Sequence, residues 1–193
     1  MAVLRRRLLG PALVVALLAS TTACAQGRST PSYVSDEPGL VRPGTVHAEK
    51  GADPDRVRAV VLTARRLYTF WSTGRTRYLD QAVTDDFQDR TLPAGRPQGP
   101  QGPRAASKAF RAAVPDLSCE LADLYVTGDT FTARLVFRGH FTGTFQGTKG
   151  RGQEVRFDAI DIQHANGPGH RITEDWHLED NLTFMQQIGV LAP

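Results

Sequence analysis

The residues best suited to acid/base chemistry lie in one stretch near the C-terminus, Arg171–Gly189, with the sequence RITEDWHLEDNLTFMQQIG. Its first half has the composition of a strand, and a strand places every second side chain on the same face. One face then carries two carboxylates among apolar side chains: Ile172, Glu174, Trp176, Leu178 and Asp180. Apolar surroundings disfavour the charged form of a carboxylate, so its pKa rises toward the range in which it can move protons. The stretch therefore predicts a buried acid at the mouth of a cavity, followed by a closing helix.

Each candidate in this stretch also has a structural interpretation. Asp180 immediately precedes Asn181-Leu182-Thr183 and the predicted helix, a position at which aspartate commonly serves as the N-cap. Glu174 is as well suited to pairing with an arginine as to chemistry, and Trp176 is suited to the core with one edge on the cavity. His140, at the start of a hairpin connection, is either a second polar group of the site or a partner for hairpin backbone.

The elements that must position these residues begin with a helix. Asp53-Pro54 is a typical helix start, apolar residues then recur at three- and four-residue steps, and Gly74 ends the pattern. Tyr68 and Trp71, at the aromatic end of the apolar face, either pack in the core or line the cavity.

Beyond Gly74 the periodicity changes from helical to alternating. We expect a short helix over 77–83, a brief strand near Phe87, a proline- and glycine-rich rim loop over 91–102 and a helix from Pro103 to Pro115. Alternating strands follow over 117–126 and 131–138, then a third from Val155 with a bulge near Asp158-Ala159, and the final strand. Helices followed by consecutive strands predict an α+β fold, in which a curved antiparallel sheet and the helices form a cone with one open end.

Several of these motifs resemble one family. Phe137–Gly143 resembles the G-x-H-x-G strand end of the SnoaL-like polyketide cyclases (ester cyclases), which belong to the nuclear-transport-factor-2-like superfamily. Gly169–Trp176 is similar to the G-(K/H)-(R/K)-I-x-E-x-W strand of that family, Asp180 matches the acid of its W-x-x-x-D pattern, and Met185–Gly189 resembles its closing Q-(L/I)-G. The chain lacks the histidine that many members carry near the position of Asp89.

This resemblance implies an intramolecular aldol ring closure without a metal or an organic cofactor. Asp180 would be the general acid/base, and His140 would orient it or donate to an enolate oxygen. The same resemblance implies a small apolar ligand in the cavity, bordered by Trp176, Glu174, Tyr68 and Trp71, and a homodimer formed through the sheet.

Charge and motifs narrow the partners further. The formal net charge is +3, and Arg5, Arg6 and Arg7 account for all of it, so the rest of the chain is neutral. A neutral domain has no electrostatic footprint for nucleic acid, so we expect no nucleic-acid partner. Neither a HExxH motif, paired cysteines nor a phosphate loop occurs in the sequence, and we expect no metal and no cofactor.

The N-terminus has the layout of a bacterial export signal: basic residues, an apolar run from Leu8 to Ala19, then small residues. Thr21-Thr22-Ala23-Cys24 resembles a lipobox, in which Cys24 would be lipidated and anchor the protein at the outer face of the cytoplasmic membrane. Ala23-Cys24-Ala25 also fits an ordinary cleavage site, which would give a soluble secreted protein. We therefore expect an export signal over 1–25, a flexible tether over 26–52 and the SnoaL-like domain over 53–193.

Two functions of different classes remain open at this point. One is a cofactor-independent cyclase or isomerase acting on a small apolar carbonyl compound. The other is a non-catalytic ligand-binding or assembly domain at the cell surface.

The lipidation of Cys24 is directly testable. Cys24→Ala is expected to move the mature protein from the detergent phase to the aqueous phase, because the lipid anchor would be lost. Phase partitioning of the two proteins measures this, and unchanged partitioning of Cys24→Ala would contradict the anchor.

Overall fold

The first helix, α1, spans Pro54–Thr73 as its sequence predicts. In the computed structural model, which describes residues 32–192, the Asp53 carboxylate caps α1 by accepting a hydrogen bond from the Asp55 N–H at 3.0 Å. Gly74 ends the helix in the left-handed conformation, with φ of 70°. The apolar face of α1, which includes Val60, Val61, Ala64 and Leu67, is buried against the strand Ser118–Thr127 and the rest of the core.

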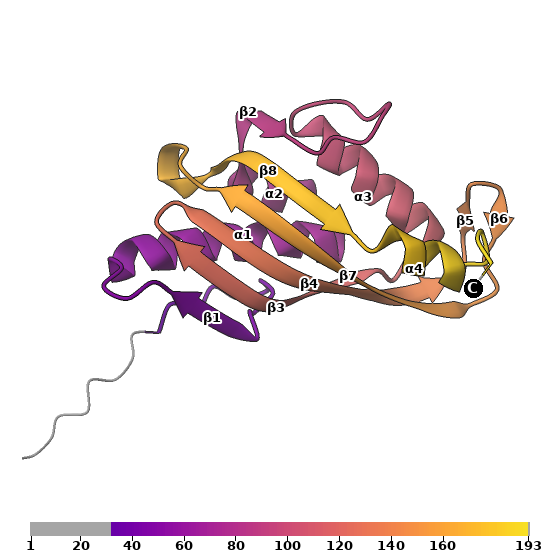
Figure 1. The fold of residues 1–193 in the computed structure, drawn as a ribbon, viewed down its shortest axis with the longest axis horizontal. Helices are drawn as coiled ribbons and strands as arrows, with labels where there is room; N and C mark the ends of the chain where they lie inside the picture. The colour runs from indigo at the N-terminus through magenta and orange to yellow at the C-terminus, as the bar shows by residue number, and fades with distance from the viewer. Residues whose placement is uncertain (1–31, 193) are drawn as a thin grey trace, which may run out of the picture. The chain divides into compact units, whose positions relative to one another are not determined.

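The remaining elements confirm the α+β class. They are β1 (Thr45–Ala48), α2 (Thr76–Ala82), β2 (Val83–Asp89), α3 (Gln101–Ala113), β3 (Ser118–Thr127), β4 (Thr130–Phe141), the small hairpin β5 (Thr144–Phe145) and β6 (Thr148–Lys149), β7 (Gln153–His164), β8 (Ile172–Glu179) and α4 (Asn181–Gln187), with a 3₁₀ turn over Pro168–His170. The main sheet has the order β1-β3-β4-β7-β8-β2. Its four central strands are antiparallel, whereas both edge strands pair in parallel, so the sheet is mixed rather than wholly antiparallel. Figure 1 shows the curved sheet with α1 and α2 behind it and α3 beside β8.

The segment predicted as a flexible tether is part of the fold over its described residues, 32–52. Thr45–Ala48 forms the edge strand β1, which pairs with β3, and Leu40 is buried in the core. The tether prediction is wrong there because the apolar residues of this segment that pack against the core are irregularly spaced, and the pairing of β1 with β3 involves the backbone, so the sequence shows no apolar period. The domain therefore begins before Asp53.

A buried arginine of α1 holds this segment. Arg65 is 1% exposed, and its guanidinium donates to the carbonyl oxygens of Ser35, Glu37 and Val41 and to the Ser35 hydroxyl, at 2.8–3.2 Å. The Val41 N–H in turn donates to the Thr69 hydroxyl at 2.9 Å. One side chain thus satisfies the backbone of a segment about 30 residues earlier in the chain.

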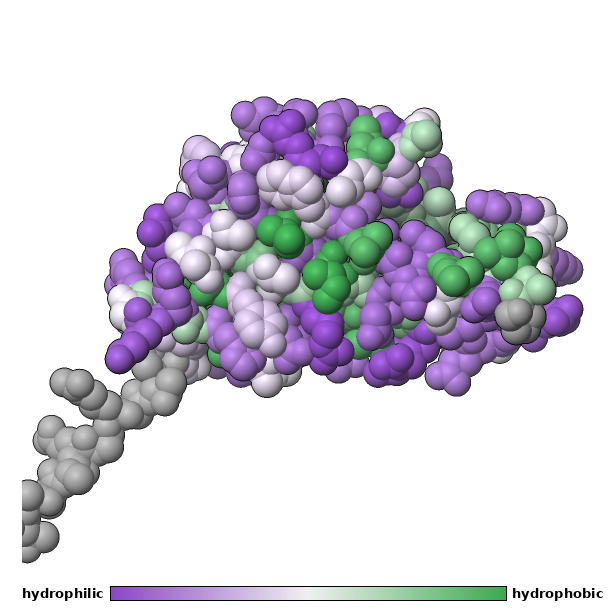
Figure 2. Space-filling model, viewed as in Figure 1, coloured by the Kyte–Doolittle hydropathy of each residue, from purple (hydrophilic) through white to green (hydrophobic). Residues whose placement is uncertain are grey.

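The sequence also predicted a bulge near Asp158-Ala159, and this prediction is wrong. β4 and β7 pair without a register shift from Thr130↔His164 to Phe141↔Gln153. Asp161 and Gln163 face inward, and the apolar side chains that suggested the bulge, Ile160 and Ile162, are 43% and 42% exposed on the outer face. Exposed apolar side chains interrupt the polar surface in Figure 2. The homodimer through the sheet stays a prediction.

The role of Arg65 predicts a large effect on stability. Arg65→Met is expected to lower the free energy of unfolding by about 2–4 kcal/mol, because buried carbonyl oxygens lose their donors. Urea unfolding measures the difference. Arg66→Met is the matched control, since Arg66 makes only a partly exposed ion pair with Glu37 and its loss is expected to cost about 1 kcal/mol or less. Equal effects of the two substitutions would contradict the role of Arg65.

Candidate active site

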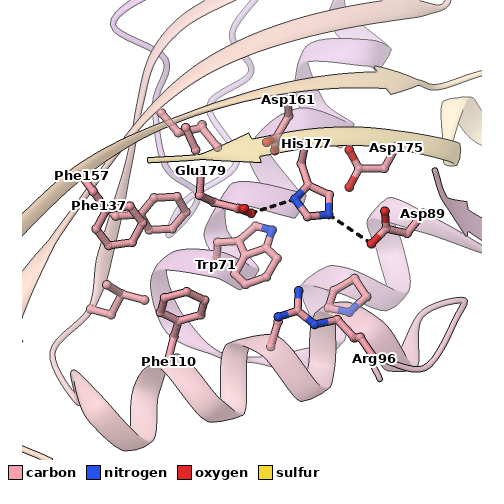
Figure 3. Close-up of a pocket in the computed structure, with 15 residues that line it drawn as sticks. Trp71, Asp89, Arg96, Phe110, Phe137, Phe157, Asp161, Asp175, His177 and Glu179 are labelled. Carbon is pink, nitrogen blue, oxygen red and sulfur yellow. Dashed lines mark hydrogen bonds and ion pairs between the residues drawn. The ribbon is translucent and has the colours of Figure 1, made fainter. Parts of the chain in front are cut away.

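A cavity opens between the inner face of the sheet, α3 and the loop that precedes α3 (Figure 3). The space between its lining atoms is about 610 Å³, which includes the part open to solvent, and about 40 Å³ of it is wide enough to hold water. One side is apolar and is formed by Trp71, Phe110, Leu117, Leu135, Phe137 and Phe157. The other side, which we call the acidic wall, consists of Asp89, Asp161, Asp175, His177 and Glu179.

Stacked rings give the apolar side its shape. Phe137 and Phe157, on the neighbouring strands β4 and β7, stack with ring centroids 5.1 Å apart, and Trp71 meets Phe137 edge-on at 6.4 Å. Phe110 of α3 stacks on Phe157 from the opposite side of the cavity at 6.1 Å. Such an arrangement offers flat aromatic surfaces to a planar apolar ligand.

His177 lies at the centre of the acidic wall, between two carboxylates. Its Nδ1 lies 2.8 Å from Oε1 of Glu179, and its Nε2 lies 3.1 Å from Oδ2 of Asp89. Burial of the ring lowers its pKa, but the hydrogen bond with Glu179 and the charges of Glu179, Asp175 and Asp89 outweigh burial and raise the pKa to about 10. Burial alone would raise the pKa of Glu179, and the hydrogen bond and charge of His177 bring it below its usual value. At neutral pH the three groups form an imidazolium held between two carboxylates.

The two other carboxyl groups of the wall hold protons more tightly than ordinary aspartates. Burial raises the pKa of Asp161 to about 7, with Glu179 acting in the same direction, while the charge of His177 and hydrogen bonds from Tyr68 and Gln163 oppose the rise. The Tyr68 hydroxyl donates to Oδ2 of Asp161 at 3.1 Å. Burial, followed by the negative charge of Asp161, raises the pKa of Asp175 well above its usual value, and the Gln163 amide donates to its Oδ1 at 2.7 Å. With a pKa of about 7, Asp161 is able to accept a proton near neutral pH, and the raised pKa of Asp175 makes that residue the candidate proton donor.

The structure places most of the predicted site residues outside this cavity. Asp180 is exposed and is the N-cap of α4, as the structural interpretation of its sequence position predicted. Its carboxylate accepts a hydrogen bond from the Thr183 N–H at 3.0 Å, and this hydrogen bond lowers the pKa of the carboxyl group. His140 is exposed and bonds to the Asp116 carboxylate at 2.7 Å through Nδ1. That hydrogen bond and the charge of Asp116 raise the pKa of His140.

Glu174 and Trp176 lie on the outer face of the sheet. Glu174 forms an ion pair with Arg90 and a hydrogen bond with His164 at 3.1 Å, and Trp176 packs edge-on to the His164 ring. Of the predicted cavity residues, only Trp71 lines the cavity, while Tyr68 is fully buried behind it and reaches it through Asp161.

The sequence assigned the wrong face of β8 to the cavity, because the side chains of β8 that point inward do not alternate regularly along the whole strand. Ile172 is buried in the core, yet the inward residues farther along are Asp175, His177 and Glu179. The register of β8 with its neighbour β2 shifts between Val83 and Gln88. A polar alternation of this kind is typical of the solvent-facing side of a strand, so it does not indicate that these residues line a cavity. The sequence of β7 did contain an indication of a polar cavity wall. Asp161 and Gln163 lie on the same strand face as the apolar Phe157 and Ala159, so alternation without a bulge places them inward.

Within residues 32–192, no group of three or more His, Cys, Asp or Glu side chains has an arrangement that could hold a metal ion. Nor does any helix in this range have the length and apolar character needed to span a membrane.

Comparison with known proteins identifies the family. A family model described as SnoaL-like polyketide cyclase matches residues 61–188, and the chain belongs to this family, as its motifs predicted. A candidate polyketide cyclase from Bacillus cereus ATCC 10987 is 40% identical, with a TM-score of 0.73 over 82% of this chain and 99% of that chain. TsrD from Streptomyces laurentii is 27% identical, with a TM-score of 0.61 over 69% and 96% of the two chains. IdmH from Streptomyces antibioticus, a candidate polyketide cyclase, is 24% identical and shares the fold with a TM-score of 0.59 over 66% and 96%. Among curated proteins, none matches this chain.

The environment of His177 predicts an unusual titration. Its pKa of about 10 in the folded chain lies above the value of about 6.5 expected in the unfolded chain, so protonation of His177 stabilises the fold. This contribution is complete below about pH 6.5 and is lost as the pH rises through 10. Nitrogen-15 NMR of the ring is expected to show an imidazolium at pH 8.

Two variants check the cause. Glu179→Gln is expected to lower the pKa of His177, because it removes a hydrogen-bonded charge, whereas Glu120→Gln on the outer face is expected to leave it unchanged. A parent ring that loses its proton near pH 6.5 would contradict the assignment.

Proposed function

We propose that this protein is a cofactor-independent cyclase or isomerase that acts by acid/base chemistry on a small apolar carbonyl compound. The observation that carries the proposal is the pair of carboxyl groups beside an aromatic surface, formed by the buried Asp161 and the partly buried Asp175. Membership of the SnoaL-like polyketide cyclase family supports the reaction class. Asp161 takes the acid/base role that the sequence pattern suggested for Asp180.

In this proposal each carboxyl group has one task. Ionised Asp161 removes a proton from the carbon next to the substrate carbonyl, which breaks a C–H bond and leaves an enolate. Asp175, whose pKa burial raises well above its usual value, donates its proton to the oxygen that becomes negative when the enolate carbon forms the new C–C bond. The net reaction moves one proton from carbon to oxygen, and proton exchange with water returns both carboxyl groups to their starting states. The aromatic side of the cavity holds the substrate in a folded conformation, which contributes through proximity.

His177 does not transfer protons in this scheme, because both of its ring nitrogens bond to carboxylates. Its positive charge offsets those of Asp89 and Glu179 and so limits their repulsion of ionised Asp161. The charge of His177 opposes the rise in the pKa of Asp161, which keeps that pKa near 7. His177 therefore positions the wall and adjusts its proton affinity.

The alternative is a non-catalytic ligand-binding domain. The narrowness of the cavity favours it, since only about 40 Å³ is wide enough for water and a substrate must displace part of the lining. A ligand that binds in the cavity and never exchanges a proton would support this second function.

We also propose that the protein is exported and anchored through Cys24. The support is the order of basic, apolar and small residues up to Ala23-Cys24 in the sequence. Cys24 lies outside the described residues, and the phase partitioning of Cys24→Ala is its test.

The acid/base proposal predicts proton exchange on a simple ketone. With 2-tetralone in deuterated buffer, the protein is expected to accelerate replacement of the protons next to the carbonyl, as measured by NMR. Asp161→Asn is expected to reduce the rate by about 10²–10⁴-fold, because a positioned proton acceptor is lost. The parent rate is expected to rise with pH through about 7, since only ionised Asp161 accepts a proton.

Asp180→Asn is the matched control. Asparagine is as good an N-cap as aspartate, so this variant is expected to keep both stability and exchange rate. The Asp161→Asn variant is expected to fold, because the substitution removes a buried charge and retains an acceptor for the Tyr68 hydroxyl. Equal exchange rates of Asp161→Asn and the parent would contradict the proposal.

A further inference from the structure

Arg96 is the cation on the cavity lining that faces the acidic wall. It belongs to the loop between β2 and α3, and Figure 3 shows its guanidinium directed toward Trp71 and His177. Within the described part of the chain its side chain makes no hydrogen bond and no ion pair of 4.0 Å or less. Most other arginine side chains in residues 32–192 form an ion pair or a hydrogen bond: Arg90, for example, pairs with Glu174, and Arg104 pairs with Asp80.

The loop that carries Arg96 is held in place by specific contacts. The Gln98 side chain accepts from the Asp89 N–H at 2.8 Å and donates to the Asp89 carbonyl oxygen at 2.9 Å, which ties the loop to the end of β2. The Arg96 N–H donates to the Pro93 carbonyl oxygen at 3.1 Å, and Gly95 completes this turn with φ of 81°. Asp89 is itself a carboxylate of the acidic wall, so the same residue fixes both sides of the cavity mouth.

Glu179, a candidate partner of Arg96 on the acidic wall, forms its ion pair with His177 and not with Arg96. Its carboxylate is engaged by His177 at 2.8 Å, and the charge of Arg96 is only the last of the influences that lower the pKa of Glu179. A guanidinium presents five N–H donors in a rigid planar fork. Those donors are therefore free for an oxygen atom of a ligand that enters between Arg96 and the acidic wall.

We propose that Arg96 binds the carbonyl oxygen of the substrate and stabilises the enolate that forms there. This inference rests on the proposed function. Asp161 removes the proton from one side of the substrate, and Arg96 donates to the oxygen on the side of the loop, where negative charge develops as the C–H bond breaks. The substrate class is then a planar ring ketone or 1,3-dicarbonyl compound, with its ring on the aromatic side and its enolisable oxygen toward Arg96.

A stable mimic of the enolate tests this inference without turnover. The anion of 2-naphthol has the ring and the charged oxygen of the 2-tetralone enolate, and its fluorescence differs from that of neutral 2-naphthol. The parent protein is expected to bind the anion, and Arg96→Gln is expected to bind it about 10- to 100-fold more weakly, the usual effect of losing hydrogen bonds to a charged group. Binding of 2-methylnaphthalene, which lacks the oxygen, is expected to change less than about threefold.

Arg104→Gln is the matched control, because Arg104 lies on α3 but pairs with Asp80 outside this cavity. It is expected to bind both ligands like the parent. Millimolar guanidinium is expected to restore binding of the anion to Arg96→Ala, which a purely structural role of Arg96 would not allow.

Two outcomes would overturn the inference. One is equal weakening of both ligands by Arg96→Gln, which would assign Arg96 to packing or to general charge balance. The other is a parent protein that does not bind the 2-naphthol anion. Because no ligand here is converted, the result is independent of proton exchange by Asp161: loss of exchange in Asp161→Asn with unchanged binding in Arg96→Gln would reject the role of Arg96 alone.

Discussion

The imidazolium of His177, held between Asp89 and Glu179, is the interaction on which the rest of the site depends. Four carboxyl groups line one small cavity, and unpaired charges in such a place would be strongly destabilising. One positive charge with a hydrogen-bonded carboxylate on each side makes two of them tolerable. The other two, Asp161 and Asp175, respond by binding protons more tightly. The acid/base capacity of the cavity is thus a consequence of how its charges are balanced.

The same interaction joins distant parts of the chain at the cavity mouth. His177 and Glu179 lie on β8, whereas Asp89 is the last residue of β2. Just beyond β2, the Thr91 hydroxyl accepts a hydrogen bond from the backbone N–H of His177 at 2.9 Å. Gln98 then ties the loop that carries Arg96 to the backbone of Asp89. The strand edge, the loop and the acidic wall are therefore positioned together, and a change in any one of them is expected to move the others.

Away from the cavity mouth, the aromatic side chains and Arg65 stabilise the fold and take no part in the proposed proton transfers. The aromatic surface of Phe137, Phe157 and Phe110 continues into the core, and Arg65 of α1 holds the segment before α1 through hydrogen bonds to its backbone. An apolar surface does not stabilise a carboxyl group, so Asp161 and Asp175 depend on the hydrogen bonds that they accept from Tyr68 and Gln163.

The sequence by itself determined α1 with both of its caps, the order of the main helices and strands from α1 onward, the rim loop and the family, because these follow from local periodicity, capping residues and short motifs. Only the tertiary structure decided which face of β7 and β8 lines the cavity. The usual alternation is misleading here, because the apolar Ile160 and Ile162 of β7 are exposed, while Asp161 is buried and the side chain of His177 is only 10% exposed. The buried polar groups are satisfied by residues far away in the chain, such as Tyr68, 93 positions before Asp161, and Asp89, 88 positions before His177. Pairings over such distances leave no trace in local periodicity, and they are what turns a polar strand face into the wall of a site.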